Sequence, residues 1–201
     1  MSEWFLVLVE QLGSAPRLNW VVFFVVACHV FLAKANSVWL YPAGIAALAV
    51  VFYNSLVVSD YASTAFSGYC VLMLTYGWMY WSARGTVISY ANHSDWWVAF
   101  SIVGAAFVVL YLILELVADA PFAIWEAGVG ATACGGVWLL SHRKVEYWVL
   151  LNVSQAFAVP LLIHSDRFLY GLLSLFLYIF AFFGMFSWRR IIHQQRNLAR
   201  A

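Results

Sequence analysis

The chain has 201 residues, of which 65% are hydrophobic and 9% are charged. Soluble domains are about one quarter charged and about half apolar, so this composition excludes a water-soluble globule and predicts a protein embedded in a lipid bilayer. The formal net charge of +1 excludes a nucleic-acid-binding protein that depends on overall basicity. Because Cys28, Cys70 and Cys134 all lie in apolar stretches, we expect buried thiols and no disulfide framework.

Seven stretches of the chain are apolar and long enough to cross a membrane as a helix, which takes about 20 residues. Residues 1–16 precede them; this segment lacks a signal-peptide pattern, and we expect it to lie at the membrane interface or to extend the first helix. The loops are short and residues 189–201 form a basic tail, so no soluble domain is expected. The predicted fold is all-α, with transmembrane helices at residues 17–33, 37–59, 62–83, 97–118, 121–141, 146–164 and 168–188.

The basic residues predict the orientation, because cytoplasmic loops of membrane proteins are enriched in Lys and Arg. With the C-terminus in the cytoplasm, only Arg17 and Arg167 of the ten basic residues lie outside. This distribution predicts an N-out, C-in protein. The basic residues placed inside are Lys34, Arg84, Arg143, Lys144, Arg189, Arg190, Arg196 and Arg200.

The third and seventh spans end alike, which indicates an internal repeat. The third ends in Gly77-x-x-x-Trp81 and the seventh in Gly184-x-x-x-Trp188, each followed by an arginine. We therefore predict two parallel three-helix repeats, residues 17–96 and 119–188, joined by a linker helix at 97–118 in a three-one-three arrangement. Weaker matches pair Lys34 and Trp39 with Lys144 and Trp148, and Ala27-Cys28 with Ala133-Cys134.

Polar side chains near the middle of the membrane are the best candidates for a binding site. Trp148, Asn152 and Gln155 share one stripe of the sixth span, and Gln155 lies about 14 Å above its start at 1.5 Å per residue. Amides at that depth need partners inside the protein or on a ligand. Two interpretations stay open: the amides bind a substrate, or they only join neighbouring helices. Tyr178 lies near the middle of the seventh span.

The 11 tryptophans divide by depth into two groups. Trp78 and Trp81 lie inside the third span and share a face at i, i+3, so with Trp148 they are candidates to stack on a flat, cationic ring. Most of the others lie near span ends, as expected of aromatic belts at the membrane interfaces. This second group includes Trp20, Trp39, Trp96, Trp97, Trp125 and Trp188.

Ionisable residues within the spans are few. Glu115 and Glu126 lie about one turn from the outer surface and His29 about one turn from the inner one. Such positions supply neither a connected proton relay nor a catalytic site, and no spacing indicates a metal site. We therefore predict neither an enzyme nor a cofactor or metal, while a purely structural membrane protein stays an alternative.

The three-one-three order, the Tyr76-Gly77-Trp78-x-x-Trp81 motif and Lys144-x-Glu146-x-Trp148 resemble the nicotinamide riboside transporter family, PnuC, over residues 19–188. Further matching segments are residues 36–45, Tyr61-Ala62, Trp125-Glu126-Ala127 and Gly184-x-x-x-Trp188. The resemblance implies a SWEET-like homotrimer in the inner (plasma) membrane. It also implies facilitated diffusion of nicotinamide riboside, which a cytoplasmic kinase then traps by phosphorylation.

Two departures from the family pattern leave the substrate open. Leu151 stands where the family usually has a second Trp, and Ser67 where many members have Gln. Thiamine transport is therefore an alternative, since both vitamins pair a cationic aromatic ring with a polar remainder. The predicted substrate-binding residues are Trp148, Asn152, Gln155, Trp78, Trp81, Tyr76, Ser67, Tyr178 and Glu126.

Overall fold

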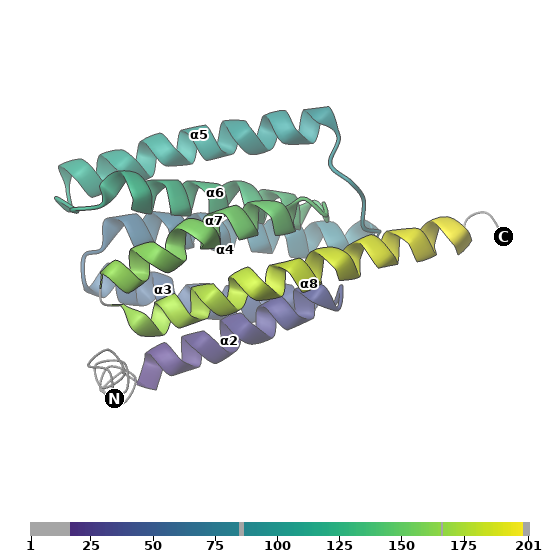
Figure 1. Ribbon diagram of the computed structural model, residues 1–201, viewed down its shortest axis with the longest axis horizontal. Helices are drawn as coiled ribbons and strands as arrows, with labels where there is room; N and C mark the ends of the chain where they lie inside the picture. Colours follow the sequence, from purple (N-terminus) through teal and green to yellow (C-terminus); the bar gives the residue numbers. More distant parts are fainter. Residues whose placement is uncertain (1–16, 85–86, 166, 199–201) are drawn as a thin grey trace.

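The structure is a computed structural model that describes residues 17–84, 87–165 and 167–198, with side chains throughout except at residues 17–19 and 84. The predicted interfacial segment 1–16 and the end of the predicted tail lie outside the described residues. Within the described part the chain is helical, apart from loops and an isolated bridge between Ser89 and Lys144. The helices are α2 (Arg17–Lys34), α3 (Leu40–Val57), α4 (Tyr61–Arg84), α5 (His93–Leu116), α6 (Ala123–Ser141), α7 (Tyr147–His164) and α8 (Phe168–Leu198) (Figure 1).

All seven predicted helices are present in the described part of the chain; α5 begins four residues earlier than predicted, at 93 instead of 97, and α8 ends ten residues later, at 198 instead of 188. α5 begins at His93 because Asn92 and Asp95 form a capping box, in which each side chain accepts a hydrogen bond from the other residue's backbone N–H. α8 continues past Trp188 to Leu198, so the described part of the predicted basic tail is helical. By length and hydropathy α3, α5, α6, α7 and α8 qualify as membrane spans, while spanning by α2 and α4 stays a prediction.

Left-handed residues end four of the helices. The backbone φ is 54° at Asn36 after α2, 57° at Ser59 after α3, 47° at Asp119 after α5 and 56° at Arg143 after α6. A residue in this conformation turns the chain away from the helix and lets the following N–H groups bond to the last carbonyls. Asn and Asp adopt it at little cost, whereas Arg143 does so against its preference.

Six helices close into a ring. α3 packs against α2 and α4, α4 against α6, α6 against α7, α7 against α8, and α8 against α2. α5 lies outside this ring against α6 and α4, and successive helices run in opposite directions (Figure 1). As a result, α3 and α7 lie on opposite sides of the ring.

Loops 107 residues apart have the same hydrogen bonds. After α2, Ser37 N donates to Leu32 O; after α6, Lys144 N donates to Leu139 O. The left-handed residues Asn36 and Arg143 are also 107 positions apart. The loops after α3 and α7 match in the same way, with Asp60 N bonded to Ser55 O and Arg167 N bonded to Leu162 O.

The same spacing relates the aromatic packing of the two halves and corrects the predicted register. Tyr41 packs against Gly77 and, 107 positions later, Trp148 packs against Gly184. The tryptophan that ends each glycine motif lies edge-on to the corresponding ring, with Trp81 on Tyr41 and Trp188 on Trp148. The two motif ends therefore pack alike at a spacing of 107 positions, which pairs Tyr41, and not the predicted Trp39, with Trp148.

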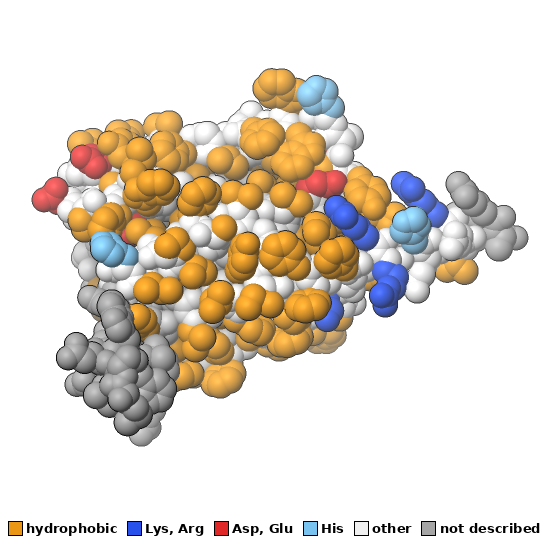
Figure 2. All heavy atoms as spheres, in the orientation of Figure 1, with side chains coloured by type: hydrophobic (Ala, Val, Ile, Leu, Met, Phe, Trp, Pro, Cys, Tyr) orange, Lys and Arg blue, Asp and Glu red, His pale blue; other side chains and the backbone are white. Residues whose placement is uncertain are grey.

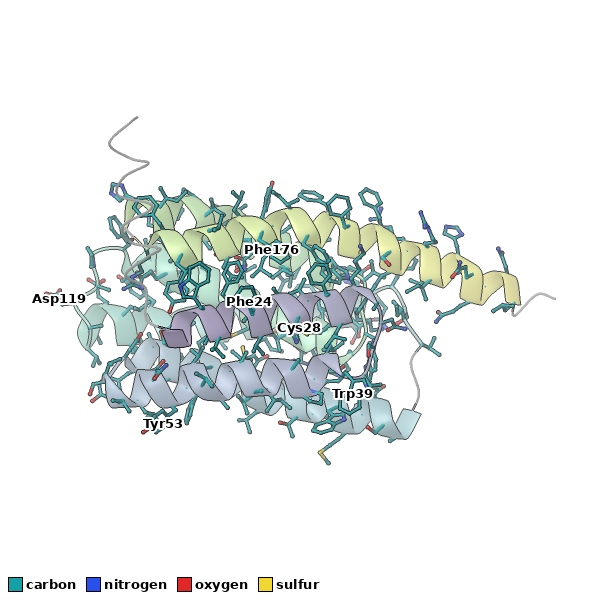
Figure 3. All side chains as sticks on the ribbon, turned by 90° about the horizontal axis from the view of Figure 1, so that it is seen from below. Phe24, Cys28, Trp39, Tyr53, Asp119 and Phe176 are labelled. Atoms are coloured by element: carbon teal, nitrogen blue, oxygen red, sulfur yellow. The ribbon has the colours of Figure 1, made fainter. Side chains whose placement is uncertain are left out.

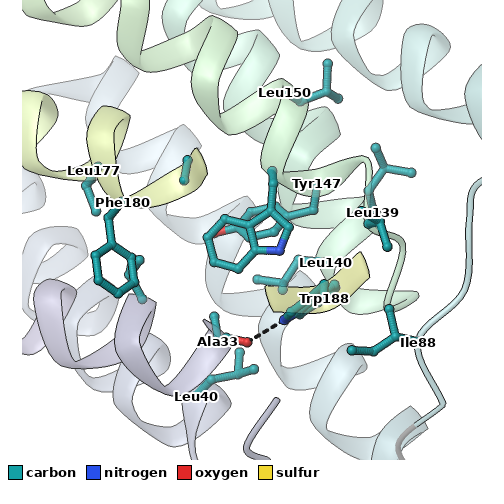
Figure 4. Packing of buried hydrophobic residues seen from close by; sticks show 14 of the residues in the cluster. Ala33, Leu40, Ile88, Leu139, Leu140, Tyr147, Leu150, Leu177, Phe180 and Trp188 are labelled. Atoms are coloured by element: carbon teal, nitrogen blue, oxygen red, sulfur yellow. Dashed lines mark hydrogen bonds between the residues drawn. The ribbon is translucent and has the colours of Figure 1, made fainter. Parts of the chain in front are cut away.

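The largest hydrophobic cluster lies at the end of the ring where α2, α4 and α6 finish. It contains Trp188, for which the prediction is wrong. This side chain was expected in the interfacial belt, but it is fully buried and its Nε1 donates to Ala33 O at 2.8 Å (Figure 4). Trp39, by contrast, is 71% exposed, as expected of a belt residue. Trp188 is buried because α8 continues as a helix and keeps this residue against α2.

The flank of the bundle is apolar, as a lipid-facing surface requires. Phe24 and Tyr53 point outward from α2 and α3 (Figure 3). Cys28 is exposed on the same surface, so the expectation of a buried thiol is wrong for this residue, while Cys70 and Cys134 are buried. Lys and Arg side chains gather at one end of the bundle, around the C-terminal part of α8 (Figure 2).

Candidate functional site

Trp148 anchors the predicted polar stripe in the first turn of α7. Its ring is fully buried and lies directly on Gly184 of α8, where an added Cβ would come within 2.5 Å of ring atoms. Trp188 covers it edge-on, with ring centroids 5.6 Å apart and planes at 88°. The Trp148 Nε1 donor is buried without a hydrogen-bond partner. This ring is therefore rigidly held, and its polar group is unused.

Asn152 lies one turn further along α7 and has a free acceptor. Its Nδ2 donates to Trp148 O at 3.0 Å within the same helix, and its Oδ1 is buried without a partner. Gln155, on the next turn, is half-buried and makes no hydrogen bond to another described residue. Among the described residues, neither amide joins α7 to a neighbouring helix. In this structure the two amides therefore do not act as helix–helix contacts.

Ser154 shows what a helix-joining side chain looks like on the same helix. Its Oγ donates to Val129 O of α6 at 3.0 Å and is buried in that interface. The Asn152 side chain has no such bond across to another helix, although a buried, unpaired carbonyl costs about 1–3 kcal/mol. This contrast marks Asn152 as a ligand-binding candidate.

The opposite wall of the ring has no matching amides. Positions 107 before Asn152 and Gln155 are Ile45 and Leu48 of α3, which are partly buried against the core. The two walls therefore differ in chemistry, with hydrogen-bonding groups on α7 and hydrocarbon on α3. Such an asymmetric site suits a molecule with one polar side and one apolar side.

The aromatic residues predicted on α4 do not come together with Trp148. Trp81 is buried and lies edge-on to Tyr41, with ring centroids 5.3 Å apart. Trp78 and Tyr76 are 40% and 44% exposed, and neither makes a ring contact with Trp148 among the described residues. Trp78 and Trp81 therefore occupy environments of different burial, despite their i, i+3 spacing.

The three remaining predicted residues also lie apart from the α7 stripe. Ser67 is fully buried, and its Oγ donates to Ser63 O in its own helix. Tyr178 packs edge-on against Phe182 of the same helix. Glu126 is half-buried in the first turn of α6. Within the described part of the chain, none of the three bonds to the stripe, and their roles in binding stay predictions.

The structure adds three residues that the sequence analysis did not select. Tyr41 is fully buried with an unpartnered hydroxyl, and Arg143 is 2% exposed although it follows α6 in a loop. Arg143 contacts the ring of Trp81 and donates from Nη1 to Oδ1 of Asn36. Aligning the halves on Gly77 and Gly184 would have identified Tyr41 as the counterpart of Trp148, and Asn36 as the counterpart of Arg143.

Comparison with known proteins gives the family. No curated protein sequence matches the chain. A solved structure titled "Crystal structure of the Vitamin B3 transporter PnuC" has a TM-score of 0.74 at 12% identity, covering 94% of this chain and 88% of that one, which shows a shared fold. The family model described as nicotinamide mononucleotide transporter matches residues 17–190, and this confirms both the resemblance to PnuC and the prediction of a transporter rather than an enzyme. The chain belongs to the nicotinamide mononucleotide transporter family.

Proposed function

We propose that the protein carries nicotinamide riboside across a membrane by facilitated diffusion. The observation that carries the proposal is the unpartnered amide oxygen of Asn152, buried one turn above the unpartnered Nε1 donor of Trp148. A donor and an acceptor at i and i+4 on one helix face match a ligand carboxamide, which accepts through its oxygen and donates through its NH2 group. Gln155 extends the same stripe toward a polar sugar.

The proposed transport uses two parallel three-helix repeats, α2–α4 and α6–α8, with α5 as the linker. The matching hydrogen bonds 107 positions apart support this arrangement, as do α2 and α6 running in the same direction (Figure 1). In transporters built this way the substrate site lies between the repeats, and one repeat rocks against the other. The basic residues gathered at one end of the bundle support an N-out, C-in orientation (Figure 2).

The remaining features of the proposal rest on the family resemblance. They are a homotrimer, a location in the inner (plasma) membrane, and trapping of the transported vitamin by a cytoplasmic kinase. Thiamine is the second candidate substrate. Leu151 leaves the choice open, because this residue lies one turn from Trp148 and is partly buried against the core, where the family usually has a second aromatic ring.

Ligand binding to the purified protein tests the proposal. We expect nicotinamide riboside at 100 times its Kd to raise the free energy of unfolding by about 2.7 kcal/mol, measured by thermal unfolding in detergent. Gln155→Ala and Asn152→Ala should weaken binding in calorimetric titration, whereas Val153→Ala, on the exposed side of the same helix, should not. Trp148→Phe keeps most of the buried ring and removes the Nε1 donor.

Each outcome of this test separates the candidates. Stabilisation by thiamine but not by nicotinamide riboside selects the second candidate. Stabilisation by neither contradicts the transport proposal and favours a structural membrane protein. Unchanged affinity in Asn152→Ala, Gln155→Ala and Trp148→Phe refutes the proposed site even where the vitamin binds.

A further inference from the structure

Two equivalent loop residues touch each other at the basic end of the bundle. Asn36 follows α2 and Arg143 follows α6, both in the left-handed conformation and 107 positions apart. The Arg143 Nη1 donates a hydrogen bond to the Asn36 Oδ1. This is a bond between a residue of one half and its own counterpart in the other half.

Such a bond fixes where the pair lies relative to the two halves. A point and its image under a two-fold rotation are separated by twice their distance from the axis, so equivalent residues in contact must lie close to it. In a transporter made of two parallel repeats the route for substrate runs between the repeats, along that axis. The bond between Asn36 and Arg143 therefore lies across the route.

Aromatic rings surround Arg143, whereas Asn36 is half-buried. The Arg143 guanidinium contacts the Trp81 side chain and lies 5.8 Å from the Tyr41 ring centroid and 6.0 Å from that of Trp188. Cation–π attraction compensates in part for burying this charge. The side chain is only 2% exposed, and burial lowers the pKa of Arg143. We call Arg143 and the three rings around it, those of Tyr41, Trp81 and Trp188, the plug.

The two loops that meet at this plug are anchored to different elements. The chain segment before α5 holds the α6–α7 loop, with Ser89 N donating to Arg143 O at 3.2 Å and Val145 N donating to Ser89 O at 3.1 Å. The last turn of α2, which leads into the α2–α3 loop, is attached to α8 instead, through the bond from Trp188 Nε1 to Ala33 O. The two loops are thus held by different elements, and the bond between Asn36 and Arg143 joins them directly.

We propose that the contact between Asn36 and Arg143 is the gate that closes the substrate route at the basic end of the bundle. The gate opens when the α2–α3 and α6–α7 loops move apart. This inference rests on the proposed transport function and its two-repeat arrangement. It adds the residues that control access from one side.

Two variants of Asn36 change the gate in opposite directions while keeping the backbone. Asn36→Gly removes the acceptor, and glycine adopts the positive φ without strain. Asn36→Asp keeps a residue that tolerates this conformation and gives Arg143 a carboxylate partner. The matched control is Ser59→Gly, which has a φ of 57° and lies exposed in the α3–α4 loop.

Access through the gate is measured with a cysteine introduced by Ile45→Cys, one turn deeper on α3 than Tyr41, in a Cys28→Ser background. A membrane-impermeant sulfonate thiol reagent is applied to sealed vesicles from each face in turn, and the chain without Ile45→Cys gives the baseline. We expect Asn36→Gly to raise the labelling rate about tenfold from the face at the basic end, since a bond to a charged group is lost. Asn36→Asp should lower this rate.

Three results overturn the proposal: a rate that Asn36→Gly leaves unchanged, an equal increase in Ser59→Gly, or an increase in Asn36→Asp. Gel-filtration profiles that match the parent protein establish that each variant is folded. The assay contains no vitamin, so the gate can fail while vitamin binding succeeds, and the two proposals are tested separately.

Discussion

Replacing Gly184 by alanine tests the contact on which the aromatic packing depends. An added Cβ would lie 2.5 Å from two atoms of the Trp148 ring, which is about 1–1.5 Å closer than an ordinary carbon–carbon contact. The ring cannot retreat, because it is fully buried and Trp188 lies against it. Overpacking of this kind costs about 1–3 kcal/mol, so we expect Gly184→Ala to lower the free energy of unfolding by that amount.

Replacing a matched glycine on another helix should change the free energy of unfolding in the opposite direction. A Cβ added to Gly104 of α5 meets nothing within 4 Å. Alanine is favoured over glycine in a helix by about 0.8–1 kcal/mol, so Gly104→Ala should stabilise the protein. Gly184→Ala has the same gain in helix propensity, and its expected net loss of stability already includes this gain. The difference between the two variants therefore isolates the clash with Trp148.

Thermal unfolding of both variants in the same detergent, followed by tryptophan fluorescence, measures this difference. A lower midpoint for Gly184→Ala together with a higher one for Gly104→Ala supports the packing described. Equal midpoints would refute it, because Trp148 would then have room that the structure does not give it.

Three further predictions concern single side chains. Asn152→Ala should leave stability unchanged or raise it, because it removes a buried unpaired oxygen, while the affinity for the transported vitamin falls; a large loss of stability would contradict the unpaired state. Trp188→Phe should cost about 0.5–1.5 kcal/mol in thermal unfolding, because one hydrogen bond to Ala33 O is lost while Asn36 N still donates to it, and no loss would mean that the Trp188 bond adds nothing to stability. Ser154→Ala should cost about 0.6 kcal/mol, the usual value for a hydrogen bond between membrane helices, and an effect on vitamin affinity would place this residue in the site instead of the interface with Val129.

Hydropathy alone predicted the number and approximate position of the helices. A membrane helix is recognised by a long apolar stretch, which is a local property of the chain, so the seven helices lie where the sequence indicates. The repeated motif ends at Gly77 and Gly184 were likewise readable, because glycine stands out where a ring must approach the backbone. The stripe of Trp148, Asn152 and Gln155 followed from helical spacing.

The surroundings of those side chains were decided by the tertiary structure. Helices that are apolar on every side do not indicate which face lies inward, so burial of Trp188 and exposure of Trp78 could not be predicted. The pairing of Tyr41 with Trp148 depends on how α3 and α7 are placed across the ring.

Arg143 shows most clearly the difference between what the sequence predicts and what the tertiary structure decides. From the sequence it is one more basic residue in a cytoplasmic loop, where positive charge is expected and normally solvated. In the structure it is buried, because the two loops that follow α2 and α6 meet and enclose it between Asn36 and Trp81. Local chemistry determined where the helices begin and end. Packing between distant segments decided which groups are buried without partners, since burial depends on neighbours that the local sequence does not specify.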